Sequence, residues 1–193
     1  TCALPISPYQ PSEAEIRRAV PLGLEDTVPL TPEDTRSLTL LGAQMPARSW
    51  RMNETIDLFI PDGGPHGLGF IRGRKPVDPT EWFFKAHFYQ DPVIPGSMGL
   101  EAFLQLLRKV ALYRWGTDCR GPEWQFEPIA VGQPHVWSYR GQVIPTNKMV
   151  EVDAVIEEID DADKKIRASG YLKVDGLVIY KVDNFAIRLA RGT

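Results

Sequence analysis

The chain has 193 residues, 43% of them hydrophobic and 24% charged, with a formal net charge of -3. This length suits one domain with a real core, and the small net charge gives no reason to expect nucleic acid as a partner. No apolar run approaches the length of a membrane span, and the two cysteines, Cys2 and Cys119, lack the spacing of metal ligands. We therefore expect a cytoplasmic globular protein without a metal, and the start at Thr1 suggests a piece of something longer.

The first 40 residues are rich in proline, with six prolines between residues 5 and 32. Prolines interrupt both helices and the hydrogen-bond ladders of sheets, so we predict a linker or wrapping arm over residues 1–40. Within it, residues 12–20 (SEAEIRRAV) are a weak helical stretch, and Thr31 is a candidate cap for a second one. A single folded domain is expected over residues 41–193.

Most segments after residue 49 have the features of β-strands. Residues 149–159 alternate apolar and acidic side chains, which is the period of a sheet with one buried face. Short turn sequences, DDAD and Asp175-Gly176, separate this segment from its successors. Consecutive strands with short turns predict an antiparallel meander. The expected strand segments are 49–60, 67–77, 136–144, 148–159, 164–174 and 177–189.

Residues 98–115 (MGLEAFLQLLRKVALYRW) form the one long predicted helix. Apolar side chains cover most of its circumference, while Glu101, Gln105, Arg108 and Lys109 form one narrow polar stripe. A helix this apolar is expected to lie inside the protein. One long central helix wrapped by a curved antiparallel sheet combines these elements in about 150 residues, which is an α+β fold.

Residues 86–101 (AHFYQDPVIPGSMGLE) place a histidine and a carboxylate at the two ends of a stiff loop. His87 follows an aromatic segment, and partial burial would favour the neutral imidazole that a general base needs. A core histidine bonded to the backbone fits the same residues. Glu101 lies about one turn into the helix, where the helix dipole alone also favours a carboxylate. A neutral base and a protonated acid are what elimination of water from a 3-hydroxyacyl group requires.

The loop between these residues has features of a carbonyl-binding site. Gly96 lets a substrate approach the main chain, and Ser97 is expected to be the N-cap of the helix. Backbone N–H groups at a helix start are able to polarise a carbonyl oxygen that gains negative charge. Turn chemistry explains the same two residues without any ligand. Gln105, one helical turn after Glu101, is placed to hold its carboxyl by a hydrogen bond.

Residues 82–106 (WFFKAHFYQDPVIPGSMGLEAFLQL) resemble the active-site segment of the β-hydroxyacyl thioester dehydratases of the hotdog fold, especially the β-hydroxydecanoyl type. They are still more similar to the dehydratase domains of polyunsaturated fatty acid synthases, which are related to polyketide synthases. The similarity continues in GQVIPTNKMV and DGLVIYKVDNFAIRL, and faintly in LLGAQMP. It covers roughly residues 40–190 and leaves the arm unmatched.

The resemblance implies a role for each candidate residue. His87 matches the catalytic base, Glu101 the catalytic acid, Gly96 the residue whose N–H binds the thioester carbonyl, and Gln105 a polar residue of the pocket. From its place in the loop, Ser97 is expected to be a further substrate-binding residue. No metal or redox cofactor is implied. The bifunctional enzymes carry Asp where this chain has Glu101, whereas dehydration-only relatives carry Glu. Dehydration to a trans-2-enoyl thioester is therefore expected, and double-bond isomerisation stays open.

The resemblance also implies partners. The substrate would be held on the phosphopantetheine arm of an acyl carrier protein. The histidine and the acid of one site come from two facing hotdogs in this family, which implies a homodimer or a sister hotdog in a larger synthase. Basic residues either dock the acidic carrier or form a solvated face; they are Arg72, Arg74, Lys75, Lys85 and Arg108.

Two other functions fit the same fold. A hotdog thioesterase would act on the same class of substrate through a water molecule activated by a carboxylate. A non-catalytic hotdog would serve as the structural partner of an active one in a megasynthase. The intact pair of His87 and Glu101 favours the dehydratase.

Overall fold

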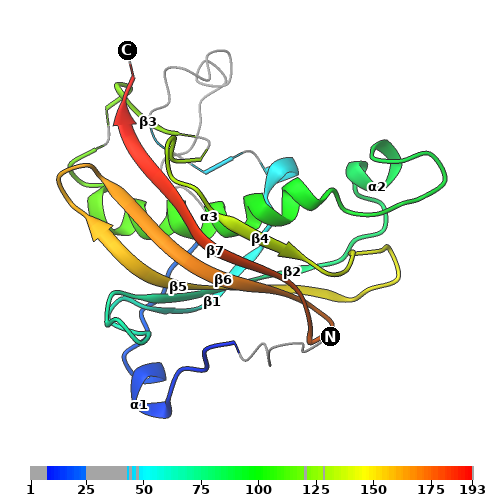
Figure 1. Ribbon diagram of the computed structural model, residues 1–193, viewed down its shortest axis with the longest axis horizontal. Helices are drawn as coiled ribbons and strands as arrows, with labels where there is room; N and C mark the ends of the chain where they lie inside the picture. Colours follow the sequence, from blue (N-terminus) through cyan, green and yellow to red (C-terminus); the bar gives the residue numbers. More distant parts are fainter. Residues whose placement is uncertain are drawn as a thin grey trace.

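A computed structural model describes residues 8–24, 43, 45–46, 48–119, 121–127 and 129–192. One long helix lies across the inside of a curved antiparallel sheet (Figure 1). The helices are α1 (Glu13–Ile16), α2 (Trp82–Ala86) and α3 (Gly96–Trp115), and a 3-10 turn, η3, spans Arg48–Trp50. The strands are β1 (Thr55–Ile60), β2 (Phe70–Pro76), β3 (Trp124–Phe126), β4 (Val136–Tyr139), β5 (Met149–Asp160), β6 (Lys165–Val174) and β7 (Leu177–Arg191).

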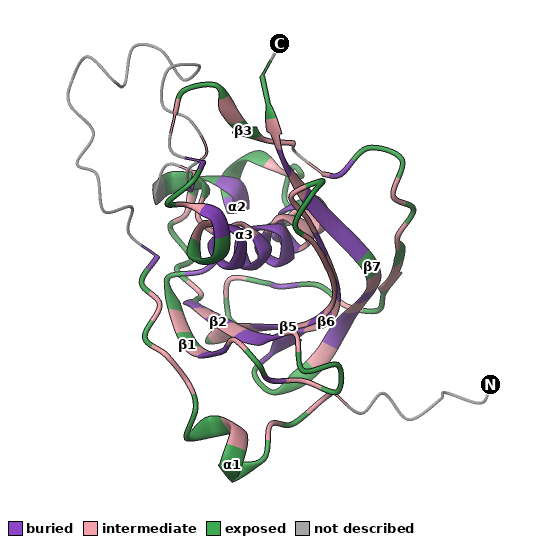
Figure 2. Ribbon diagram, turned by 90° about the vertical axis from the view of Figure 1, so that its left-hand side faces the viewer, coloured by how far each residue is buried: buried purple, intermediate pink, exposed green. Residues whose placement is uncertain are grey.

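The sheet has the strand order β1-β2-β5-β6-β7-β3, with β4 also paired to β7, and each pairing is antiparallel. The turn between β6 and β7 uses Asp175 and Gly176, both at positive φ (50° and 85°), which matches the twist of a tight hairpin. Figure 2 shows the buried helix α3 enclosed by the strands. The predicted α+β architecture, a long central helix wrapped by a curved antiparallel sheet, is confirmed.

The first predicted strand was wrong in its N-terminal half. Residues 49–53 form no ladder with the sheet, the Glu54 N–H makes a first bond to the Arg74 carbonyl of β2 at 2.7 Å, and β1 begins at Thr55. The reason is that the backbone here bonds to a side chain of α3. The Gln105 amide accepts from the Met52 N–H at 2.8 Å and donates to the Trp50 carbonyl at 2.9 Å. The short elements α2 and β3 were missed because five and three residues are too few to show a period.

The described part of the arm, residues 8–24, packs against the sheet. The Val20 N–H donates to the Phe59 carbonyl at 2.9 Å, on the outer edge of β1. The ring of Tyr9 lies against that of Phe70, with 5.5 Å between their centroids. Arg18 forms an ion pair at 2.9 Å with Asp62 in the turn after β1. These contacts hold residues 8–24 against the sheet, whereas Thr31 and the predicted boundary at residues 40–41 lie outside the described residues.

Glu15 ties this arm to the β1–β2 turn, and we expect its docking to depend on pH. The carboxylate accepts from the Tyr9 hydroxyl, from Ser12 as part of a capping box, and from the Gly64 N–H at 3.1 Å. These bonds, that of Tyr9 first, lower the pKa of Glu15 from 4.5 to about 2. A lowered pKa means that the stabilisation is present above pH 4.5 and is lost as the pH falls through about 2.

NMR of the Tyr9 ring resonances during acidification measures the loss of docking of residues 8–24 on the sheet. We expect Glu15→Gln to weaken the docking at neutral pH and to remove the acid-dependent step. Arg17→Ala is the matched control, because Arg17 is exposed and pairs only with Glu13 among the described residues. Tyr9 resonances that stay constant through the acid range in the wild-type protein would contradict the assignment.

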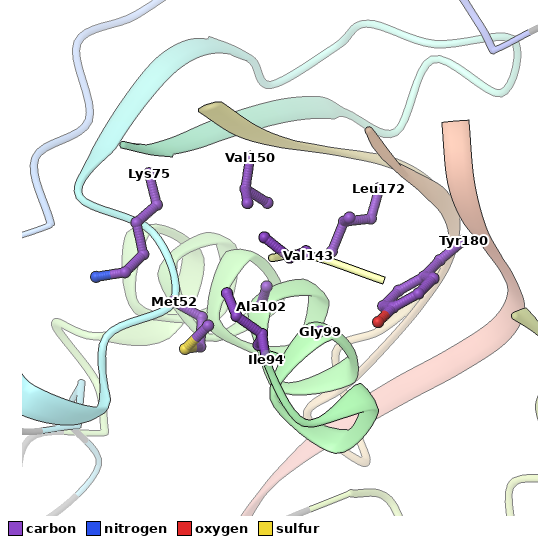
Figure 3. Close-up of a pocket in the computed structure, with 9 residues that line it drawn as sticks. All are labelled: Met52, Lys75, Ile94, Gly99, Ala102, Val143, Val150, Leu172 and Tyr180. Atoms are coloured by element: carbon purple, nitrogen blue, oxygen red, sulfur yellow. The ribbon is translucent and has the colours of Figure 1, made fainter. Parts of the chain in front are cut away.

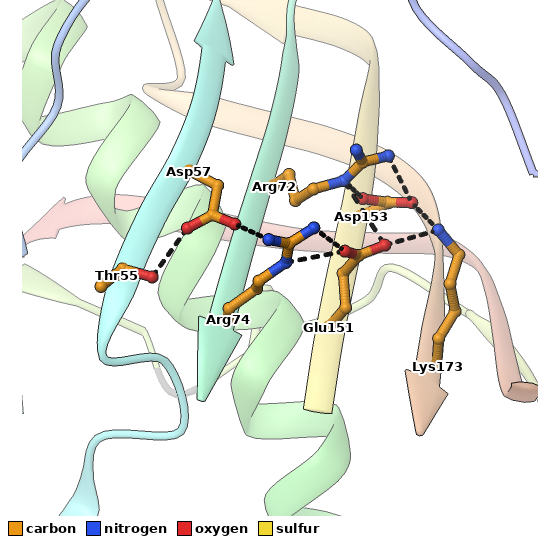
Figure 4. A network of polar contacts seen from close by, with 7 residues as sticks. All are labelled: Thr55, Asp57, Arg72, Arg74, Glu151, Asp153 and Lys173. Carbon is orange, nitrogen blue, oxygen red and sulfur yellow. Dashed lines mark hydrogen bonds and ion pairs between the residues drawn. The ribbon is translucent and has the colours of Figure 1, made fainter. Parts of the chain in front are cut away.

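Charged side chains gather on the outer face of the sheet, where β2, β5 and β6 lie side by side (Figure 4). Asp153, with a side chain only 3% exposed, pairs with Arg72 at 2.6 Å and with Lys173 at 2.7 Å. Glu151 pairs with Lys173 at 2.8 Å and with Arg74 at 2.6 Å. Burial alone would raise the pKa of Glu151, but its bonds to Lys173 and Arg74 outweigh burial and lower it.

This network changes the interpretation of the basic residues. The Arg72 side chain is 16% exposed and the Lys75 side chain 5%, so neither belongs to a solvated face. Arg74 and Arg108 also pair with carboxylates, those of Glu151 and Glu101. Lys85, in α2, is the member of the predicted set that is exposed and forms no ion pair within the described part of the chain. A basic docking face built from these residues is therefore not supported.

Candidate active site

His87 lies directly after α2 and is positioned by that short helix. The buried rings of Phe83 and Phe84 anchor α2, and the His87 N–H donates to the Phe83 carbonyl at 3.1 Å. The imidazole is half-buried and packs against Phe88, with 4.0 Å between ring centroids. Its nitrogens make no hydrogen bond to any described residue, so it is not a core histidine bonded to the backbone. Both nitrogens remain available to a ligand.

Helix α3 begins at Gly96, one residue before Ser97, which the sequence predicted as its N-cap. Pro95 occupies the N-cap position without a side-chain hydrogen bond, and Ser97 lies exposed in the first turn of α3. The prediction of Ser97 as the N-cap was therefore wrong. The Pro95 carbonyl already accepts from the Met98 and Gly99 N–H groups, at 2.9 and 3.4 Å, so the helical bonding begins before Ser97. The fixed φ of proline suits this entry into a helix.

Gly96 is required by close packing at the helix start. A Cβ at this position would lie 2.8 Å from Trp137 and 3.2 Å from Tyr139, two rings of β4. The N–H groups of Gly96 and Ser97 find no backbone acceptor in the part of the chain that is described. The glycine therefore has a packing role, and the two N–H groups are donors that a carbonyl oxygen is able to use.

Glu101 lies on α3 in a cradle of two donors. Its Oε1 accepts from Gln105 Nε2 at 3.1 Å and from the Arg108 guanidinium, and its Oε2 lies 3.4 Å from Arg108 Nη2. The side chains of Glu101 and Arg108 are 27% and 11% exposed. Gln105 is fully buried and is itself fixed by the backbone of residues 50–52. Gln105 therefore holds the carboxyl, as the sequence predicted.

The single chain does not bring all the predicted residues together. Gly96, Ser97, Glu101 and Gln105 share α3, whereas His87 lies on the other side of the loop 88–95. Among the described residues, His87 and Glu101 form no hydrogen bond or ion pair with each other. Sequence reasoning missed Arg108 as the partner of Glu101, although its position seven residues later on the same polar stripe was the available signal. Trp137 and Tyr139 carried no signal in the sequence.

A cavity lies between α3 and the sheet, with about 280 Å³ of space between the atoms, part of it open to solvent (Figure 3). Tyr180 forms one wall, and its buried hydroxyl makes no regular hydrogen bond within the described residues. Burial first, and then the neighbouring Tyr139, raise the pKa of the Tyr180 phenol. His87 and Glu101 are not among the lining residues, which are Met52, Lys75, Ile94, Gly99, Ala102, Val143, Val150, Leu172 and Tyr180.

Other kinds of site find little support in the described residues. Within these ranges, no three His, Cys, Asp or Glu side chains are grouped so that they would hold a metal ion. The helices described are all too short or too polar to cross a membrane. Cys119 is buried and free of disulfides, and burial raises the pKa of its thiol, which opposes a nucleophilic role.

Comparison with known proteins gives the following matches. The family described as the FabA-like domain matches residues 45–183. One of the subunits of a polyunsaturated fatty acid synthase, from Thraustochytrium sp. (strain ATCC 26185 / S-3), is 36% identical over 157 residues, which cover 78% of this chain and 10% of that protein. The chain thus spans about a tenth of that relative's length.

Two solved structures resemble the fold at low sequence identity. The dehydratase heterocomplex ApeI:P from Xenorhabdus doucetiae has a TM-score of 0.48 and 10% identity, over 77% of this chain and 87% of that one. The crystal structure of S. sahachiroi AziG has a TM-score of 0.43 and 8% identity, over 64% of this chain and 85% of that one.

Proposed function

Since this chain belongs to the family of FabA-like domains, a dehydratase-type hotdog family, we propose that it removes water from 3-hydroxyacyl thioesters in fatty acid or polyketide synthesis. The relative from a polyunsaturated fatty acid synthase supports this setting. The observation that carries the proposal is the unbonded, half-buried imidazole of His87, on a loop that leads to the free N–H groups of Gly96 and Ser97. An acyl carrier protein would present the substrate.

The proposed reaction divides the work among three groups. His87 takes the proton from C2 of the thioester, and the Gly96 N–H donates to the carbonyl oxygen as it gains negative charge. Glu101 of a second hotdog gives its proton to the hydroxyl on C3. The C2–H and C3–O bonds break, a double bond forms between C2 and C3, and water leaves. The product is the trans-2-enoyl thioester, and no cofactor takes part.

A second hotdog is part of the proposal because His87 and Glu101 of one chain form no hydrogen bond or ion pair with each other among the described residues. Large aromatic side chains of η3, of α2 and of the two residues after His87 are exposed, and exposed apolar patches on a protein mark interaction sites. The exposed fractions are 53% for Trp50, 41% for Trp82, 57% for Phe88 and 91% for Tyr89. We propose that a second copy, or a sister hotdog in a larger synthase, covers this surface.

A non-catalytic role is the second candidate, and the ion pair of Glu101 with Arg108 is the observation that favours it. A carboxylate engaged by a guanidinium serves as a proton donor only after that pair opens. Docking of a second hotdog would have to open it. A structural partner of an active hotdog would keep the pair closed.

A mass-spectrometric assay of 3-hydroxyacyl groups held on a carrier protein tests the proposal. We expect loss of one water from the acyl group, no effect of a metal chelator, and a product that coelutes with the trans-2 isomer rather than a cis isomer. A saturated acyl carrier without the 3-hydroxyl is the control and is expected to stay unchanged. Release of free acid would favour a thioesterase, and an unchanged substrate with a folded protein would favour the structural role.

A further inference from the structure

Lys75 is a buried charge that the reaction proposed above does not use. It lies near the end of β2 with a side chain only 5% exposed. Figure 3 shows its stem along the wall of the cavity and its ammonium turned away from Tyr180. A lysine is almost never buried unless its charge is paired, because removing an ammonium from water is unfavourable. The partners of Lys75 therefore indicate its role.

The ammonium of Lys75 lies between two carboxylates from different segments. It is 2.7 Å from Glu81 Oε1 and 3.7 Å from Glu54 Oε1. The Glu81 side chain is 21% exposed, whereas that of Glu54 is 48% exposed. The second oxygen of Glu81, Oε2, is buried and accepts no hydrogen bond from any described residue. Glu81 therefore depends on Lys75 for the compensation of its charge, while water compensates Glu54.

Glu81 is the residue directly before α2, and this short helix needs outside contacts to hold its place. A helix of five residues is unstable on its own, and the Glu81 side chain makes no capping bond to it. Burial of Phe83 and Phe84 keeps α2 on the protein. Hydrophobic burial is non-directional, however, so it does not fix how the helix is turned. The ion pair with Lys75 has defined partner atoms and fixes the start of the helix.

The imidazole of His87 takes its position from the other end of α2. His87 follows the helix directly, and its nitrogens make no hydrogen bond to any described residue. A further polar contact of α2 runs from the Trp82 indole N–H to the Ser49 carbonyl at 3.0 Å, but it lies at the surface, where water competes for both groups. The Lys75–Glu81 pair is therefore the stronger directional restraint on the helix that carries His87.

We infer that Lys75 is a positioning residue for His87: it holds Glu81 at the start of α2 and thereby fixes the imidazole at the end. This rests on the function proposed above. A base takes a proton efficiently only when the reacting atoms are held about 3–3.5 Å apart, and a misplacement of about 1 Å lowers the rate by roughly 100-fold. Lys75 acts through Glu81 and α2 and takes no part in the proton transfer.

The double variant Lys75→Met/Glu81→Leu tests the inference. Replacing both partners of a buried pair by apolar side chains of similar size is tolerated better than removing one of them, so the protein is expected to fold. We expect kcat for dehydration to fall by about 10- to 100-fold, while KM stays within about threefold of the wild-type value. The assay is run at a temperature at which circular dichroism shows the variant wholly folded. A pair with a purely structural role would then leave kcat unchanged.

Glu81→Gln is the conservative variant. Its amide oxygen still accepts from the Lys75 ammonium, so we expect kcat to stay within about threefold of the wild-type value. Lys181→Met/Asp183→Leu is the matched control, because this pair, also at 2.7 Å, lies on β7 with side chains 36% and 31% exposed. Its kcat is expected to equal that of the wild type. A folded Lys75→Met/Glu81→Leu protein with the wild-type kcat overturns the inference.

NMR of the imidazole resonances tests the position of His87 without turnover. The chain has three histidines, His66, His87 and His135, and we expect the resonances of His87 alone to shift in Lys75→Met/Glu81→Leu. His87 resonances that stay at their wild-type positions in this variant overturn the inference. Absence of water loss in the wild-type protein would instead overturn the proposed function, while the resonances still test whether Lys75 positions His87.

Discussion

His87→Ala is expected to lower kcat for dehydration by roughly 10²- to 10⁴-fold while the protein stays folded. The loss follows from removal of the group that takes the C2 proton. Folding is expected to survive because the imidazole is only half-buried, packs on the exposed ring of Phe88 and forms no hydrogen bond with any described residue. Water loss from a carrier-bound substrate, measured by mass spectrometry, gives kcat, and circular dichroism reports the fold. His66→Ala is the control, since His66 is an exposed turn residue.

Glu101→Gln is expected to lower kcat to a similar extent, and the two variants together test whether the site is shared between chains. In a mixed dimer of His87→Ala and Glu101→Gln chains, one of the two sites would contain both an intact histidine and an intact acid. Mixing the two inactive proteins, with exchange of protomers, is therefore expected to restore activity. A mixture that exchanges protomers but stays inactive would show that His87 and Glu101 do not act in one shared site.

Asp153→Ala is expected to destabilise the fold by about 1.5–3 kcal/mol. The variant removes the nearer carboxylate of Arg72 and leaves Arg72 and Lys173 to share Glu151, while the Lys173 side chain is only 11% exposed. The free energy of unfolding in urea, fitted at constant m-value, measures the effect.

Asp183→Ala is the control for Asp153→Ala, because Asp183 forms a surface pair with Lys181, and such pairs contribute about 1 kcal/mol or less. Equal losses of stability in the two variants would mean that burial of the outer-face network has no energetic consequence. A large loss confined to Asp153→Ala would identify this carboxylate as the centre of the network.

Periodicity predicted the parts of the fold that are long. The alternation in residues 149–159 and the apolar circumference of residues 98–115 correspond to β5 and α3. Periodicity failed for residues 49–54. There the Met52 N–H is bonded to the side chain of Gln105, which lies 53 residues later in the sequence. A contact so distant in sequence leaves no local pattern.

The candidate site was predictable where its residues share one helix. The pairing of Glu101 with Gln105 follows from a spacing of one helical turn. Ser97 was misplaced as a cap because Pro95 starts the helix earlier, and capping preferences do not resolve a shift of one or two residues. The cavity could not be predicted, because the residues that line it come from α3 and from strands that are far from α3 in the sequence.

The strand β7 and the arm show that the folding unit is longer than the family match. The match ends at residue 183, but β7 continues to Arg191, and its last residues, Leu189–Arg191, pair with β3. At the other end, Val20 covers the edge of β1 although the match begins at residue 45. A protein trimmed to 45–183 would therefore lose half of a central strand and uncover two sheet edges, and exposed edges promote aggregation. Recombinant versions should keep residues 8–192.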